Sequence, residues 1–443
     1  MTDPSDLTIS EASQAIENGV LSSVQLVESC LNRINQVEMR LQAWVQVLEE
    51  QAIERAEQAT REIESRGKKG PLHGIPIGIK DIYYTKGIRT TACSKIRADF
   101  IPEYDSTAVA KLKKAGAIVL GKTVTTEFAA GDPPVTVNPW NEAHTPGGSS
   151  SGSAVSVAAD MAIASIGTDT GGSIRIPASA CGVVGLKPTH GEVSLCGVVP
   201  LAPTLDHAGP LAGTVADAQL LFELLRQTPT DQSKRPVKTL DQTHLVIPRK
   251  YFFDRMDTEI ATMFDRIVRS LETHGSVVTD VEIPHATEIP AVYLHTQLPE
   301  AALSHQLTLT EQPELYSPSV RARLELGRYV RAEDYLLAQH ARDVLRKEVD
   351  NALLNSDALI LPTLPIVPPL LGDDSIVIDG ASDSVRALTL RLTQLFDLTG
   401  HPAISLPCGS IDGVPIGIQL VGHRHATNDL LALATQVESM LGT

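Results

Sequence analysis

Residues 74–81, GIPIGIKD, and residues 116–123, GAIVLGKT, contain two short apolar runs bounded by glycine and proline, as buried strands often are. Between them lies STAVAKLKKAG, residues 106–116, whose apolar positions recur at helical spacing. A strand, a helix and a second strand in this order are typical of α/β proteins, because parallel strands need a long crossover connection. The pattern predicts an α/β fold with a large mixed, mostly parallel β-sheet that helices cover on both faces.

The flanking segments extend this pattern in both directions. Residues 1–70 read as a helical lead-in, with apolar side chains at helical intervals over residues 24–37 and with Ser10 or Ser23 as candidate N-caps. Residues 131–214 are rich in Gly, Ser and Thr, which predicts a loop-dense region with helix starts at 149–160 and 171–180. Functional groups are expected there.

The second half of the chain follows a polar stretch at residues 226–242, the best candidate for a linker or surface loop. Beyond it, helical patterns cover residues 256–273 and 317–354, and a closing helix ends the chain. Strands are predicted at VVTDVEI (277–283), ALILP (358–362), AISLP (403–407) and PIGIQLVG (415–422).

Composition and charge narrow the classes of function. The 443 residues carry a formal net charge of -16, and a phosphate-binding surface would need basic residues, so we expect a small-molecule ligand and no direct contact with nucleic acid. No apolar run reaches the ~18 residues that span a bilayer, and the start MTDPSDLTIS lacks a signal-peptide pattern. We expect a cytoplasmic protein with no membrane contact; a homodimer is compatible with these observations.

Three motif matches fail on their context. GAIVLGKT satisfies the Walker A pattern, but its middle residues suit a buried strand better than a phosphate loop. DTG at 169–171 occurs once, whereas aspartic proteases need two carboxylates. GSSSG at 148–152 matches a nucleophile elbow at Ser150, with Asp206 and His207 or His401 as rival triad members, but a loop precedes it instead of the required strand.

The five cysteines do not suggest a site. They are scattered, odd in number and without a CxxC pair, which fits neither a disulfide framework nor a zinc site. We expect reduced thiols.

Three segments remain that together carry chemistry: GIPIGIKD with Lys80, TPGGSSSGS with Ser149, and GTDTGGSIR with Ser173. A serine hydroxyl needs an adjacent base, and a lysine can be that base if burial keeps it neutral. A lone buried lysine is more often a salt-bridge partner, here of Asp81 or Asp169. The glycine-rich turn favours catalysis, since its consecutive backbone N–H groups suit an oxyanion.

These segments resemble the amidase signature family, whose core motifs match GGSSSGS at 147–153 and GTDTGGSIRIP at 167–177. The resemblance continues through ACGVVGLKPT (180–189), LDHAGPLA (205–212) and GHPAISLPCG (400–409), and it covers nearly the whole chain. It implies one amidase domain over residues 1–443, made of the helical lead-in (1–70), a signature core with the triad (71–225) and the remaining sheet and cleft helices (243–443).

The resemblance also implies roles for individual residues. Ser173 becomes the acylated nucleophile, Ser149 a bridging serine preceded by a cis peptide bond, and Lys80 the base. The implied oxyanion hole consists of the N–H groups of Thr170, Gly171, Gly172 and Ser173. The residues that hold the loops are Ser150, Asp169 and Arg175. For Arg175 we expect a structural pairing with Asp169. Ser151 departs from the family pattern, where glycine is common, and it must point away from the relay.

The predicted reaction is hydrolysis of a carboxylic acid amide through an acyl-enzyme, without a metal or organic cofactor, and the same chemistry suits carbamates or esters. The segments expected to choose the substrate are 129–140, 196–203 and 290–330. One alternative is the glutaminase subunit of a tRNA-dependent amidotransferase, although that family's asparagine-rich stretch before Tyr-Asp-Gly is missing. Another is a non-catalytic binding protein with the same fold, which the presence of all three catalytic positions disfavours.

Overall fold

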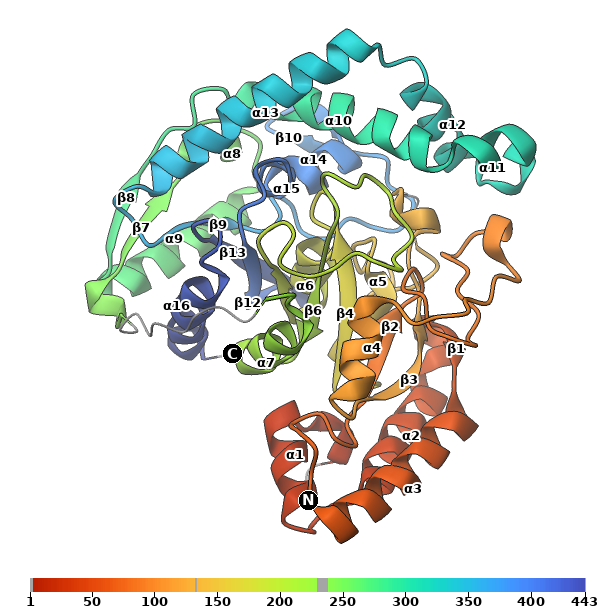
Figure 1. The fold of residues 1–443 in the computed structure, drawn as a ribbon. Coiled ribbons are helices and arrows are strands. Elements are labelled where there is room, and N and C mark those ends of the chain that lie inside the picture. Colours follow the sequence, from red (N-terminus) through yellow and green to blue (C-terminus); the bar gives the residue numbers. More distant parts are fainter. Residues whose placement is uncertain (1–2, 132–133, 229–237, 443) are drawn as a thin grey trace.

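The computed structural model describes residues 3–131, 134–228 and 238–442. An 11-stranded sheet runs through it in the order β1-β3-β2-β4-β6-β5-β12-β13-β9-β7-β8 (Figure 1). Its strands are β1 (Trp44–Val47), β2 (Pro76–Lys80), β3 (Ile118–Thr123), β4 (Ala164–Asp169), β5 (Val184–Lys187), β6 (His207–Ala212), β7 (His244–Ile247), β8 (Val277–Asp280), β9 (Ala358–Pro362), β12 (Ala403–Ile411) and β13 (Val414–Val421). A separate hairpin pairs β10 (Ser375–Ile378) with β11 (Ala381–Ser384).

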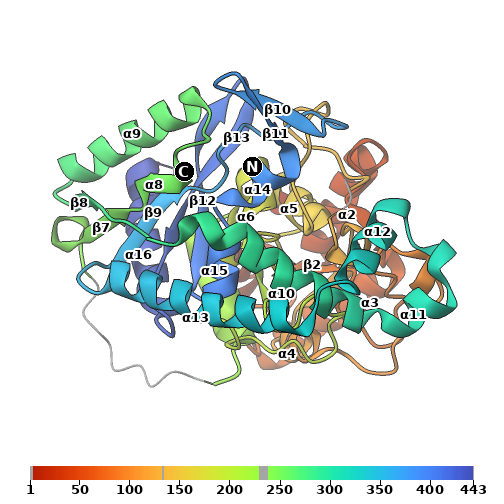
Figure 2. The same cartoon turned by 90° about the horizontal axis from the view of Figure 1, so that it is seen from above.

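Helices surround this sheet. They are α1 (Ile9–Glu17), α2 (Ser23–Leu41), α3 (Glu49–Arg66), α4 (Thr107–Lys114), α5 (Ser151–Ala158), α6 (Arg175–Cys181), α7 (Val215–Leu225), α8 (Arg249–Phe252), α9 (Thr258–Thr273), α10 (Ile289–Ser304), α11 (Gln306–Glu311), α12 (Pro318–Gly327), α13 (Ala332–Leu353), α14 (Val385–Arg391), α15 (Gln394–Thr399) and α16 (Thr427–Leu441). Helices α1 to α3 gather near the N-terminus, and α10 to α13 lie at the opposite end of the molecule (Figure 1). In the view from above, α10 to α13 are in the foreground (Figure 2). Every residue of β2, β4 and β13 is buried, as expected for strands covered on both faces.

The sheet is mixed, as predicted, but it is less parallel than predicted. Parallel pairs join β2 to β3 and β4, and β7 to β8 and β9, whereas antiparallel pairs are more numerous among the described strands. One reason lies in Asp412 and Gly413, which join β12 to β13 with φ angles of 50° and 78°. An Asp-Gly pair with positive φ makes a two-residue hairpin, and a hairpin is necessarily antiparallel.

Most predicted elements are confirmed, including β2, α4 and β3 from the opening pattern. The lead-in helices begin slightly earlier than predicted, because Thr8 and Ser22 form capping boxes in place of Ser10 and Ser23. Of the predicted linker at 226–242, residues 229–237 lie outside the described residues.

The largest correction concerns residues 131–214, which contain β4, β5 and β6 in addition to loops. Strand β4 was not predicted because its small residues do not form an apolar run. Close packing requires these residues to be small. A Cβ on Gly167 would lie 2.7 Å from the Ser150 hydroxyl oxygen.

The sheet order brings the candidate residues together. Strands β2 and β4 are parallel neighbours, so their carboxyl ends meet at one edge of the sheet. Lys80 is the last residue of β2, and Asp169 is the last residue of β4. The turn that follows Asp169 leads directly into α6. Within the described residues, no helix combines the length and apolar character needed to cross a membrane.

Candidate active site

Lys80 lies at the centre of the site, with no exposed surface. Its Nζ atom lies 2.8 Å from Ser149 Oγ, 2.9 Å from Ser150 Oγ and 2.8 Å from Thr168 Oγ1. All three partners are hydroxyl groups, which either donate or accept a hydrogen bond. The surroundings therefore accommodate an amine as well as an ammonium group.

Burial lowers the pKa of Lys80 to about 7, while the carboxylates of Asp169 and Asp206 oppose that shift. A substantial share of Lys80 is consequently neutral near pH 7. The salt-bridge alternative is not supported, because Asp81 pairs with Lys122 at 3.1 Å and Asp169 pairs with Arg175 at 3.0 Å.

The serine loop is held firmly against β4. The peptide bond between Gly148 and Ser149 is cis, as the resemblance implied, and Gly147 has a φ of 73°. Ser150 Oγ donates to the Thr168 carbonyl at 3.1 Å and accepts the Thr168 N–H at 3.2 Å. These bonds fix the loop so that Ser149 Oγ faces Lys80.

The rival triad centred on Ser150 does not form. Ser150 is completely buried, and no strand precedes it within residues 134–150. His207 Nε2 lies 3.2 Å from Lys187 Nζ, and His401 Nε2 lies 3.1 Å from Asp350 Oδ1, so neither imidazole is directed at this serine. Ser151 begins α5, and its hydroxyl faces the Val124 carbonyl, away from Lys80 as the sequence required.

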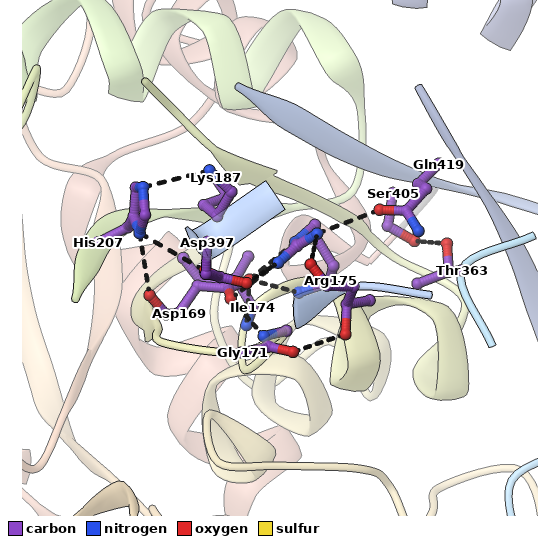
Figure 3. Close-up of polar contacts among 12 residues, drawn as sticks. Asp169, Gly171, Ile174, Arg175, Lys187, His207, Thr363, Asp397, Ser405 and Gln419 are labelled. Carbon is purple, nitrogen blue, oxygen red and sulfur yellow. Dashed lines mark hydrogen bonds and ion pairs between the residues drawn. The ribbon is translucent and has the colours of Figure 1, made fainter. Parts of the chain in front are cut away.

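The turn after β4 is organised by the Asp169 carboxylate (Figure 3). It accepts the N–H groups of Gly172 at 2.6 Å and Ile174 at 3.1 Å. Gly172 has a φ of 135°, a conformation that other residues rarely adopt. A Cβ on Gly171 would lie 2.4 Å from the Tyr293 hydroxyl oxygen, so glycine is required there for space.

Of the four N–H groups implied for an oxyanion hole, the Gly172 group is already engaged by Asp169. The N–H groups of Thr170, Gly171 and Ser173 donate no hydrogen bond to the part of the chain that the structure describes. Ser173 is half-buried, and its carbonyl accepts the Ser150 N–H at 3.1 Å. This bond joins the turn of Ser173 to the loop of Ser149.

Arg175 supports the turn from behind, as the sequence indicated. The side chain is fully buried and binds Asp169, and it also donates from Nη2 to Asp397 at 2.6 Å. Its Nη1 atom donates to the Thr393 carbonyl and to Gln419 Oε1, both at 3.1 Å.

Sequence reasoning missed several supporting residues, namely Thr168, Lys187, His207, Tyr293, Thr393, Asp397 and Gln419. Three of them, Thr168, Lys187 and His207, lie inside motifs that were recognised only as wholes. The signal available for these three was a polar side chain in a segment expected to be buried. Tyr293 lies in the 290–330 segment expected to choose the substrate, and Gln419 is a polar residue in the predicted strand 415–422, but neither was singled out. The described residues contain no group of three metal-ligating side chains.

Comparison with known proteins places this geometry in context. The family model named Amidase matches residues 25–431. An "Amidase" of Pseudomonas putida is 38% identical, with 92% of this chain and 90% of that protein covered. A glutamyl-tRNA(Gln) amidotransferase subunit of Desulfatibacillum aliphaticivorans is 35% identical, with 97% and 96% covered. A solved structure titled "Crystal structure of amidase" superposes with a TM-score of 0.92 at 35% identity, covering 98% of this chain and 99% of that one.

Proposed function

This chain belongs to the Amidase family and hydrolyses amide C–N bonds, and on that premise we propose that Ser173 is the nucleophile, Ser149 the proton relay and Lys80 the base. One observation carries the proposal. The fully buried Lys80 amine, with a pKa of about 7, lies 2.8 Å from Ser149 Oγ. A buried neutral amine against a hydroxyl is what proton transfer from serine requires.

The proposed cycle starts from neutral Lys80. As Ser173 Oγ attacks the amide carbon, its proton passes to Ser149 Oγ and the Ser149 proton passes to Lys80 Nζ. The ammonium then returns a proton by the same route to the leaving nitrogen, the C–N bond breaks, and Ser173 remains as an ester. Water attacks the ester carbon and loses its proton along this route, which releases the acid and restores Ser173.

The negative charge on the tetrahedral intermediate is assigned to the N–H groups of Thr170, Gly171 and Ser173. Donors already fixed in position stabilise the developing charge without reorganisation. Gly172 is left out because its N–H serves Asp169. Its role is to shape the turn.

The substrate we propose is a small amide with an aliphatic or aryl group. Apolar side chains of Ile82, Ala129 and Val199 lie around Thr168 and Thr170, close to the turn that carries Ser173. Tyr293 on α10 lies against Gly171, inside the 290–330 segment expected to choose the substrate. Of the two other such segments, 196–203 contributes Val199 and 129–140 contributes Ala129, and residues 132–133 of the latter lie outside the described residues. Carbamates and esters fit the same chemistry.

The catalytic unit we propose is the whole chain as one domain. Its sheet takes strands from residue 44 to residue 421, with β5 paired to β12 in its middle. Dividing the chain between these strands would break their pairing.

The test is active-site labelling with a fluorophosphonate followed by peptide mapping. We expect the label on Ser173 and none on Ser173→Ala. Ser150→Ala is the matched control, because Ser150 also contacts Lys80 but is not the proposed nucleophile. A label on Ser150, or undiminished labelling of Ser173→Ala, contradicts the proposal.

A second candidate is the glutaminase subunit of a tRNA-dependent amidotransferase. It is favoured by the similarity to the glutamyl-tRNA(Gln) amidotransferase protein of Desulfatibacillum aliphaticivorans over almost the entire length of both chains. Hydrolysis rates for aryl anilides, short aliphatic amides, carbamates and glutamine separate the two functions. Turnover of glutamine alone, together with co-purifying partner proteins, would replace the first proposal by the second.

A further inference from the structure

Behind the 169–173 turn lies a sealed cluster of charged side chains (Figure 3). Asp169, Arg175, Lys187 and Asp397 are completely buried. Arg175 binds both carboxylates, at 3.0 Å to Asp169 and 2.6 Å to Asp397. One guanidinium thus faces two carboxylates, which leaves an excess negative charge if both are ionised. Such a charge is costly in the protein interior.

Lys187, the last residue of β5, is linked to this cluster through His207, whose Nε2 atom faces Lys187 Nζ and whose Nδ1 atom lies 3.5 Å from Asp397 Oδ1. Its Nζ atom contacts the Pro188 carbonyl at 3.3 Å, the His401 carbonyl, and His207 Nε2 at 3.2 Å. The two carbonyl oxygens only accept hydrogen bonds. The third contact depends on the protonation of His207.

The His207 ring is fixed as an acceptor toward Lys187. Its Nδ1 atom lies 2.6 Å from the Leu205 carbonyl oxygen, so Nδ1 carries the hydrogen. Burial and the nearby Lys187 lower the pKa of His207 well below its ordinary value, which keeps the ring neutral. Nε2 is then a lone pair directed at Lys187.

All three partners of Lys187 therefore accept hydrogen bonds, and only an ammonium group has three N–H donors to satisfy them. A neutral amine would place its lone pair against one of these acceptors. Lys80 differs, because its three hydroxyl partners also fit a neutral amine.

We propose that Lys187 is a positioning residue whose ammonium group balances the second carboxylate of the Asp169–Arg175–Asp397 cluster and so holds the 169–173 turn in its working shape. The inference rests on the proposed function, in which this turn binds the oxyanion. Lys187 touches neither substrate nor reacting atoms, so its effect passes through Arg175 and Asp169.

The route of this effect is short. Asp169 orients the turn by accepting from Gly172 and Ile174, and Arg175 orients Asp169. Without the Lys187 charge, Asp397 either takes a proton or draws Arg175 toward itself. Both changes weaken the hold of Arg175 on Asp169, and the donors of the turn lose their alignment.

The location of one proton distinguishes this arrangement from its alternative. Burial and Asp169 raise the pKa of Asp397 well above its ordinary value, against the opposing charges of Arg175 and Lys187. Burial lowers the pKa of Lys187 to about 7, and Asp397 opposes that shift. If the proton resided on Asp397 instead of Lys187, the amide of Asp397→Asn would replace a neutral acid and change little.

The experiment compares Lys187→Met, Asp397→Asn and the double variant, with kcat, KM and the rate of fluorophosphonate labelling at Ser173 as readouts. We expect Lys187→Met to lower kcat and the labelling rate about 100-fold with little change in KM, which is the effect of misplacing one oxyanion donor. Asp397→Asn alone should lower them less. The double variant removes one negative charge along with the positive one. It should therefore show a kcat and a labelling rate about tenfold or more above those of Lys187→Met.

Lys122→Met is the matched control, because Lys122 is an equally buried lysine paired with Asp81 outside this cluster. Adding Asp397→Asn to Lys122→Met must restore neither kcat nor the labelling rate. If Lys187→Met is too unstable for kinetics, the yield of folded protein and its melting temperature are measured in place of activity. The double variant must then exceed Lys187→Met in both. A silent Asp397→Asn, or a double variant no better than Lys187→Met, overturns the inference. Absence of labelling at Ser173 in the wild type contradicts instead the proposed function.

Discussion

Lys80 and Lys122 are both completely buried, on parallel strands that lie side by side, yet their surroundings differ in kind. Lys80 meets three hydroxyl groups. Lys122 meets the Tyr83 carbonyl at 2.8 Å, the Thr90 hydroxyl at 2.7 Å and the Asp81 carboxylate at 3.1 Å. Burial lowers the pKa of Lys80 to about 7 and that of Lys122 to about 8.

Burial therefore does not by itself make a lysine a base. A carboxylate beside the amine stabilises the charged form, and a carbonyl requires a donor. Hydroxyl groups accept either state of the amine, which allows the proton to move. The partners of each lysine therefore separate a candidate base from a structural cation.

The largest expected effect comes from removing the amine of Lys80. Lys80→Met should lower kcat/KM by about a thousandfold, as loss of a general base does, while the free energy of unfolding changes little or rises. The second expectation follows because an amine in an uncharged site is costly to bury. Steady-state kinetics and urea unfolding measure the two quantities. An active Lys80→Met enzyme would remove the basis of the relay.

The matching change at Lys122 should act on stability. Lys122→Met leaves the Asp81 carboxylate buried without its cation and should reduce the free energy of unfolding by about 3 to 5 kcal/mol, measured by urea unfolding. Adding Asp81→Asn should recover part of this loss. Equal damage to stability by Lys80→Met and Lys122→Met would mean that the two lysines have the same role after all.

The pH dependence of kcat/KM tests whether Lys80 acts in its neutral form. The active form of Lys80 is neutral and its pKa is about 7, so kcat/KM should fall as pH drops below 7 and level off above it. The limiting slope on the acid side is about tenfold for each pH unit, because one proton is taken up. Rates must be corrected for the fraction of protein that is unfolded at each pH. A kcat/KM that stays constant from about pH 5 to pH 8 would exclude Lys80 as the base.

The smallest effect is expected at Asp206, whose carboxylate raises the pKa of Lys80 from a distance. Its own pKa is raised to about 6 by burial, and it accepts the Thr170 hydroxyl at 2.6 Å. Asp206→Asn removes the negative charge and should move the acid limb of the pH profile of kcat/KM to lower pH by a fraction of a unit. A shift to higher pH would contradict the assignment of that limb to Lys80.

Much of the fold was predictable where apolar periodicity was strong. The runs at β2, β3, β9 and β13 are apolar and were predicted as strands. The amphipathic spacing of α2 and α9 predicted helices close to their observed bounds. Strand β4 was missed because its sequence, ASIGTD, is small and polar. Such residues are selected by close contact with the Ser149 loop, which a single sequence does not display. Strand direction was also missed: the β12–β13 hairpin had a local signal in Asp412-Gly413 that was overlooked, and the other antiparallel pairs join segments that lie farther apart in the chain.

The site was predictable to the extent that its residues lie in recognisable motifs. Lys80, Ser149 and Ser173 come from three such motifs, and the structure brings Lys80 and Ser149 into contact. The loss of Gly172 as a free donor was not predictable, because it follows from the rotamer of Asp169. The pairing of Arg175 with Asp169 was predicted, but its other partners were not, because Asp397 and Gln419 lie more than two hundred residues further along the chain.

That separation along the chain has a consequence for synthesis. Every proposed catalytic residue has been synthesised once residue 173 is made, but Arg175 finds Thr393, Asp397 and Gln419 only after more than two hundred further residues are added. A nascent or truncated polypeptide that ends before α15 thus contains the Asp169–Arg175 pair but lacks the distant groups that hold Arg175 in place. The support behind the 169–173 turn is therefore complete only when the C-terminal part of the chain has been made and has folded against it.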